Sequence, residues 1–181
     1  MNIKSSKNKK IVPITTVAAL ILLFAFLAIC TPIQGITNNG GEKQPPDVSD
    51  AHPSIECLWP PNHKFVDITI EGVTDPDGDA VTITITRITS DEPTATIDGA
   101  GGEVHAPDAA GVGTETACVR AERSGTGDGR VYEITFVARD GKGGETEGSV
   151  FVKVPHDESG DCVSVDSGQI YNATGTNFIN G

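Results

Sequence analysis

The stretch AVTITITRI, residues 80–88, alternates β-branched apolar residues with threonine. Val81, Ile83 and Ile85 share one face of an extended chain, and the intervening threonines share the other. Successive side chains of a β-strand point to opposite faces of the sheet, and β-branched residues are enriched in strands. The stretch therefore predicts a strand with one buried face and one solvated face.

The same period of two recurs along the chain. It is found in FVDITIEG at 65–72, ETACVRAE at 115–122, VYEITFVARD at 131–140 and SVFVKVP at 149–155. A short first strand around 55–58 and one or two weak strands between 95 and 112 bring the expected number to about seven. Glycine-rich and aspartate-rich turns separate the strands, and no stretch after residue 30 offers a helical face of useful length. This organisation predicts an all-β fold, an immunoglobulin-like antiparallel β-sandwich.

Residues 1–30 have the character of an export segment. Four lysines and no acidic residue in the first ten positions precede an apolar run at 11–29. The run lies between the length of a cleavable signal core, about 7 to 15 residues, and that of a spanning helix, about 20. We expect an N-terminal hydrophobic helix, either a signal peptide or a membrane anchor. Lipid attachment at Cys30 is a third alternative, although Ile29 is not the small residue that usually precedes such a cysteine.

The rest of the chain divides by composition. Residues 31–50 read as a flexible linker, 51–157 as the sandwich domain and 158–181 as a loose polar tail. The tail contains the sequence Asn-Ala-Thr at Asn172, an acceptor for N-glycosylation or an ordinary loop asparagine. The expected location is extracellular or at the cell surface, secreted or membrane-anchored.

The exported part is strongly acidic. All 25 acidic residues but only 9 of the 13 basic ones follow Cys30, which gives a formal charge of −16. Such a charge argues against a nucleic-acid partner, because phosphates need basic side chains. This negative charge favours the binding of cations, or it serves only to keep the protein soluble.

Three cysteines lie in the exported part: Cys57, Cys118 and Cys162. Disulfides persist outside the cell, so one pair and one remaining thiol are expected, and the sequence leaves the pairing open. No cysteine and histidine spacing typical of a structural zinc site occurs.

Four motifs relate the chain to known extracellular modules. They are LWPPNHK at 58–64, VTDPDGD at 73–79, RAERSGTGDGRVY at 120–132 and ARDGKGG at 138–144. Over residues 54–157 the chain resembles immunoglobulin-like modules of bacterial and archaeal surface proteins, and it is similar to cadherin-like and HYR modules. The resemblance implies a non-enzymatic extracellular module.

The acidic motif is the candidate metal site. Asp75, Asp77 and Asp79 stand at every second position, and Gly78 supplies a bend. Calcium takes about six to eight oxygen ligands, and this spacing can direct several carboxylates at one point. The motif is not an EF-hand, since no glutamate occupies its twelfth position. Further oxygens are expected from Asp140, with Asp128 and Asp157 as additional candidates. The alternative is a solvated turn in which aspartates accept hydrogen bonds from the backbone.

No catalytic motif is present, so we do not expect an enzyme. The favoured function is a structural or adhesive module of the cell envelope, stabilised by calcium and contacting a protein or glycan. The alternative is a soluble or tethered ligand- or carbohydrate-binding domain that uses loops near Trp59 and His63. His63 and His156 can face one another, but a transition-metal site would need ligands that the sequence does not place.

Overall fold

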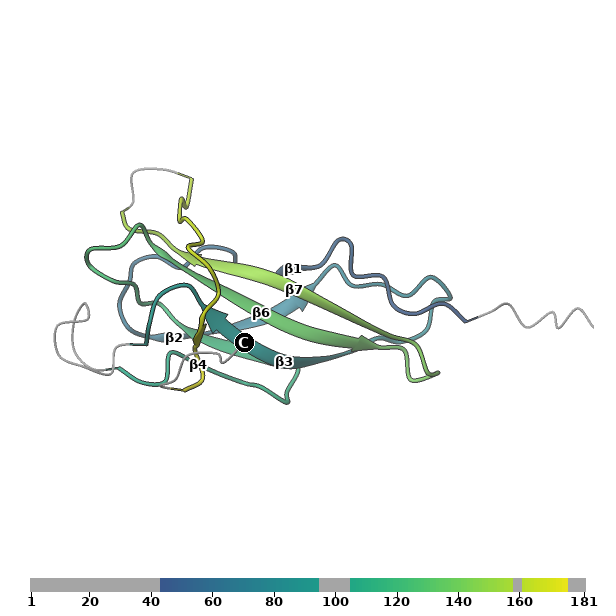
Figure 1. Ribbon diagram of the computed structural model, residues 1–181. Coiled ribbons are helices and arrows are strands. Elements are labelled where there is room, and N and C mark those ends of the chain that lie inside the picture. Colours follow the sequence, from purple (N-terminus) through teal and green to yellow (C-terminus); the bar gives the residue numbers. More distant parts are fainter. Residues whose placement is uncertain (1–42, 95–104, 158–160, 176–181) are drawn as a thin grey trace, which may run out of the picture. The chain divides into compact units, whose positions relative to one another are not determined.

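The computed structural model describes residues 43–94, 105–157 and 161–175, whose strands form two antiparallel sheets (Figure 1). The expected hydrophobic helix at 1–30 lies outside these residues, as does the linker up to residue 42. Within the described ranges, no helix is long and apolar enough to cross a membrane.

Each sheet has four strands. The first, in the order β1-β2-β5-β4, contains β1 (His52–Pro53), β2 (Phe65–Glu71), β5 (Thr116–Arg120) and β4 (Ala109–Ala110). The second, in the order β7-β6-β3-β8, contains β7 (Glu145–Val154), β6 (Arg130–Arg139), β3 (Thr82–Ser90) and β8 (Tyr171–Asn172). All pairings within these sheets are antiparallel. The five long strands fall on the five stretches with period-two patterning, so the all-β prediction is confirmed.

The apolar faces of both sheets share one core. Its fully buried members include Ile68, Ala117 and Val119 from the first sheet and Ile85, Ile134, Phe136 and Val152 from the second. Phe136 lies so close to Gly148 on β7 that a Cβ there would approach the Phe136 Cζ atom to 2.7 Å. A side chain at position 148 would therefore force the buried Phe136 ring to shift.

The first strand is not where the sequence predicted it. Strand β1 occupies His52–Pro53. Residues 55–58 form no strand and pair with β7 only through an isolated parallel bridge between Cys57 and Lys153. The backbone of Lys153 nevertheless bonds in both directions, to the carbonyl of Glu56 and from the amide of Leu58, at 2.8 Å each. These bonds satisfy part of the exposed edge of β7.

The prediction of a loose tail does not hold for residues 161–175. Cys162 forms a disulfide with Cys57, and β8 pairs with the free edge of β3 through Asn172 opposite Thr89. Ala173 is completely buried. An edge strand offers unpaired N–H and C=O groups, so a short polar segment can dock by backbone bonds with few apolar contacts.

The strand directions define two opposite ends. The acidic end comprises the β2–β3 connection at 72–81 and the β6–β7 turn at 140–144. The histidine end comprises residues 62–64, 105–108 and 120–129, which flank the start of β2, the start of β4 and the β5–β6 connection. Figure 1 shows the long strands running between the two ends.

Candidate functional site

At the acidic end, the incoming segment 43–47 contacts both turns. Asp47 exchanges two backbone hydrogen bonds with Thr74, of 2.8 and 3.1 Å. On the other side, the Thr146 hydroxyl donates to the carbonyl of Pro46 at 2.6 Å, and a Cβ on Gly144 would lie 2.9 Å from the Pro45 Cα atom. The fold thus brings the aspartate-rich motif and the turn that contains Asp140 to one end of the domain.

Asp75 organises the acidic turn. Its Oδ1 atom accepts hydrogen bonds from the amides of Asp77 and Asp79, at 2.9 and 3.1 Å. The amide of Gly78, whose φ is +79°, donates to the Asp75 carbonyl at 3.0 Å. The Oδ2 atom of Asp75 is buried and accepts no hydrogen bond from the described residues. One carboxylate oxygen therefore builds the turn, and the other remains available.

Asp77 and Asp79 hold the incoming segment. The amide of Gln44 donates to Asp77 Oδ2, and the Lys43 ammonium lies against Asp79 Oδ2, both at 2.7 Å. The hydrogen bond to Asp79 raises the pKa of Lys43, and the charges of Asp79, Asp77 and Asp75 raise it further against the opposing effect of desolvation. The turn therefore presents a concentration of negative charge to a cation.

Asp140 is 4% exposed and lies at the end of β6. Its Oδ1 atom accepts hydrogen bonds from the amides of Lys142 and Gly144, at 2.6 and 2.9 Å. Backbone N–H donors, that of Lys142 above all, hold the pKa of Asp140 below its ordinary value. The Oδ2 atom is buried and receives no hydrogen bond from the described part of the chain. Asp140 thus presents an ionised carboxylate with one oxygen left over.

Asp128 and Asp157 do not belong to this end. Asp128 precedes β6, whereas Asp140 follows it. The ten residues of β6 separate these two aspartates by about 30 Å, because each strand residue advances about 3.4 Å. Asp157 follows the end of β7, at the same end as Asp128. Their proposed role as calcium ligands beside Asp75 is therefore wrong.

At the opposite end, three side chains meet that the sequence did not connect. His63 Nδ1 and His105 Nδ1 lie 3.0 and 3.3 Å from the same Glu122 Oε2 atom. The two imidazole rings stack with centroids 4.6 Å apart and an interplanar angle of 21°. Within the described residues, this is the group of three potential ligands whose donor atoms all lie within 4.8 Å of one another. Asp75, Asp77, Asp79 and Asp140 form no such group.

His156 is not a member of this group of three. His156 Nε2 instead lies 3.3 Å from the Gly125 carbonyl oxygen. Sequence reasoning missed His105 because it stands in a segment with weak patterning, and missed Glu122 because an acidic residue at a strand end is ordinarily part of a surface ion pair.

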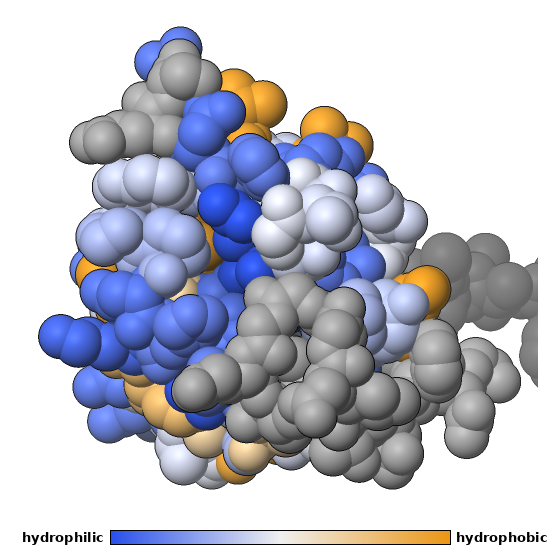
Figure 2. Space-filling model, turned by 90° about the vertical axis from the view of Figure 1, so that its left-hand side faces the viewer, coloured by the Kyte–Doolittle hydropathy of each residue, from blue (hydrophilic) through white to orange (hydrophobic). Residues whose placement is uncertain are grey.

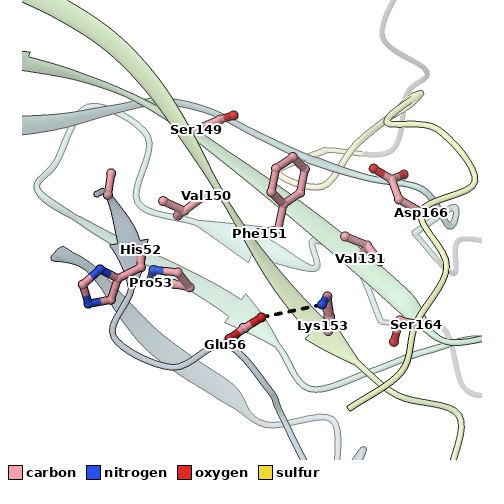
Figure 3. A pocket seen from close by; sticks show the side chains of 11 residues that line it. His52, Pro53, Glu56, Val131, Ser149, Val150, Phe151, Lys153, Ser164 and Asp166 are labelled. Atoms are coloured by element: carbon pink, nitrogen blue, oxygen red, sulfur yellow. Dashed lines mark ion pairs between the residues drawn. The ribbon is translucent and has the colours of Figure 1, made fainter. Parts of the chain in front are cut away.

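In the described part of the chain, two hollows lie near aromatic side chains. One, of about 480 Å³, lies over β7, where Phe151 stands beside the ion pair of Lys153 and Glu56 (Figure 3). The other, of about 310 Å³, includes Trp59 and Phe65 in its lining. Trp59 is 39% exposed. The face seen in Figure 2, the left-hand side of Figure 1, is mostly hydrophilic.

No family model, curated protein or solved structure matches this chain.

Proposed function

We propose that this chain is a non-enzymatic structural or adhesive module of the cell envelope, an immunoglobulin-like sandwich whose N-terminal connection is stiffened by calcium. The observation that carries the proposal is the position of segment 43–47 between two aspartate turns. Each turn keeps a buried carboxylate oxygen, on Asp75 and on Asp140, that the described residues leave without a hydrogen bond. The extracellular location is supported by the export segment and by the disulfide between Cys57 and Cys162.

Calcium suits the chemistry of this end. It is a hard cation that prefers carboxylate and carbonyl oxygens in flexible arrangements. The Lys43 ammonium already lies within the negative region as a single positive charge, and a dication would balance more of that charge. An ion held by both turns would restrict the direction in which segment 43–47 enters the domain. A fixed entry direction suits a module that projects a binding face from a membrane.

The test is a thermal melt of the full chain in excess chelator and in millimolar calcium. An ion that binds only the native state at about 100 times its Kd adds about 2.7 kcal/mol to the free energy of unfolding. At this domain size that corresponds to roughly 8–11 °C in Tm, taking about 3–4 °C per kcal/mol. We expect the rise in the parent and its loss in a variant with asparagine at positions 75, 77 and 79.

Two further variants sharpen the test. Lys43→Gln removes the ammonium that competes with calcium. The calcium concentration that gives half of the rise in Tm should therefore be lower for this variant than for the parent. Asp128 lies at the other end of β6, so the Tm of Asp128→Asn should rise with calcium as that of the parent does. The proposal fails if the parent melts identically with and without calcium, or if the triple variant keeps the full calcium response.

The second candidate, a carbohydrate-binding domain, rests on the exposed Trp59 side chain beside its hollow. An exposed indole can stack on an apolar face of a sugar ring while its N–H bonds to a hydroxyl. Trp59 is the one tryptophan in the sequence, so its fluorescence reports this site alone. A saturable change on titration with oligosaccharides, independent of calcium, would favour this function over the first.

A further inference from the structure

We propose that His63, His105 and Glu122 form a second metal site, for a divalent transition-metal ion, with Zn²⁺ the ion that suits them best. The site lies at the histidine end and is independent of the calcium proposed for the acidic end. Imidazole nitrogen and carboxylate oxygen are ligands that zinc accepts, and three protein ligands with an open position are a known zinc arrangement.

The spacing of the donor atoms fits one ion. Ligands about 2.0–2.1 Å from a tetrahedral zinc lie about 3.3 Å from one another. The distances from Glu122 Oε2 to the Nδ1 atoms of His63 and His105 are 3.0 and 3.3 Å. The two distances to Glu122 thus match those in a formed site, and the three donor atoms together lie within 4.8 Å of one another.

Arg120 fixes the backbone on both sides of the cluster. Its Nη1 atom donates to the His63 carbonyl and its Nη2 atom to the Pro107 carbonyl, both at 2.9 Å. His63 also donates its amide to the Ala121 carbonyl at 2.9 Å. The two histidine segments are therefore held next to the end of β5 by one guanidinium, on a side chain that is 13% exposed. Such fixed surroundings favour a metal site because less ordering is required on binding.

The rings must move a little for the ion to enter. A metal ion lies close to the plane of each imidazole that binds it, and two rings stacked at 21° do not direct their in-plane lone pairs at one nearby point. The His63 side chain is 46% exposed and that of His105 is 23% exposed. His63 is therefore the ring that can rotate, and its exposure leaves room for a water ligand.

The charge around Glu122 favours an added cation. Its side chain is 7% exposed. Linked ion pairs join Glu122, Asp108 and Glu92 to Arg120 and Arg130, three carboxylates to two guanidiniums. The Arg120 Nε atom lies 3.9 Å from Glu122 Oε2, which is too long for a hydrogen bond. A zinc ion would therefore balance a buried carboxylate that its neighbours compensate incompletely.

The experiment is a calorimetric titration of Zn²⁺ into the full chain. Calcium is present in excess, so that any cation site at the acidic end is already filled. We expect one zinc per chain. His63→Asn, His105→Asn and Glu122→Gln should each weaken zinc binding by at least about tenfold, because loss of even the groups that support metal ligands costs about 10–100-fold. Asparagine tolerates the positive φ of His63, 61°, better than most residues. Cobalt substitution should give the visible absorption of a four-coordinate site in the parent and not in the variants.

The matched control is His52→Asn. His52 Nε2 lies 3.7 Å from Glu71 Oε2, a histidine and carboxylate pair with no place in the three-ligand group. Zinc affinity should be unchanged in this variant. The proposal is overturned if the parent shows no saturable zinc binding, if His52→Asn weakens binding as much as His63→Asn, or if all three ligand variants bind as the parent does. Should one variant fail to fold by circular dichroism, the other two decide the outcome.

Discussion

The two ends of β6 carry arginines in opposite environments, which gives a sharp prediction. Arg130 is 2% exposed. Its Nη1 atom donates to Asp108 Oδ2 at 2.5 Å and to the Tyr132 hydroxyl at 3.0 Å, and its other nitrogens donate to Glu92 at 3.3 Å and to the Pro93 carbonyl at 3.1 Å. Burial raises the pKa of Asp108, and the charge and hydrogen bond of Arg130 oppose that rise. Arg130→Met would leave the completely buried Asp108 carboxylate without its hydrogen-bonded cation, with only Arg120 Nε, 3.5 Å from Asp108 Oδ1, nearby.

The expected loss follows from that burial. Removing one partner of a buried ion pair costs about 3–5 kcal/mol, because the remaining charge is desolvated and uncompensated. Arg139 at the other end of β6 forms an equally direct pair with Glu145, at 2.7 Å, but the two side chains are 42% and 57% exposed. Exposed pairs contribute about 0.2–1 kcal/mol. Arg139→Met should therefore cost several times less than Arg130→Met.

The assay is urea unfolding of the parent, both single variants and the double variant Arg130→Met with Asp108→Leu, at one fixed calcium concentration. Fixed calcium keeps any contribution of ion binding constant. The double variant should recover part of the stability lost by Arg130→Met, since it removes the stranded charge as well. Equal slopes of the unfolding free energy against urea concentration would show that each protein exposes the same surface area on unfolding.

Two results would refute this reasoning. Losses for the variants at positions 130 and 139 that agree within about 0.5 kcal/mol would mean that burial does not decide the energy of these pairs. A double variant less stable than Arg130→Met alone would mean that Asp108 contributes through bonds other than the one to Arg130.

Two other predictions concern the cysteines. The Cys57–Cys162 disulfide joins residues 105 positions apart. Replacing both cysteines with serine should therefore lower the free energy of unfolding by about 4–5 kcal/mol on the chain-entropy account and raise hydrogen exchange at 161–175. A loss below about 1 kcal/mol in urea unfolding would contradict this. Burial, with a smaller contribution from Asp67, raises the pKa of Cys118 to about 11. Because the thiolate is the nucleophile, the rate at which iodoacetamide alkylates Cys118 should rise about tenfold per pH unit from pH 7 to 9.5. A plateau in that rate by pH 9 would refute the raised pKa.

Local patterning predicted the long strands because the information is contained in each stretch. Residues 131–140 alternate so regularly that Tyr132, Ile134, Phe136 and Ala138 could be assigned to the core, and all four are completely buried. The acidic turn was also readable, since the bonds from Asp75 to the amides of Asp77 and Asp79 span only two and four residues. Its calcium ligands stay a prediction.

What the sequence by itself determined is therefore the five long strands, their buried faces and the turn chemistry between them. The tertiary structure alone decided which distant groups meet: Cys57 with Cys162, β8 with the edge of β3, and His63 with His105 and Glu122. The physical reason is range. Strand periodicity and turn hydrogen bonds act between near neighbours in the chain, whereas these contacts join residues up to 105 positions apart and depend on how the two sheets and their connections pack.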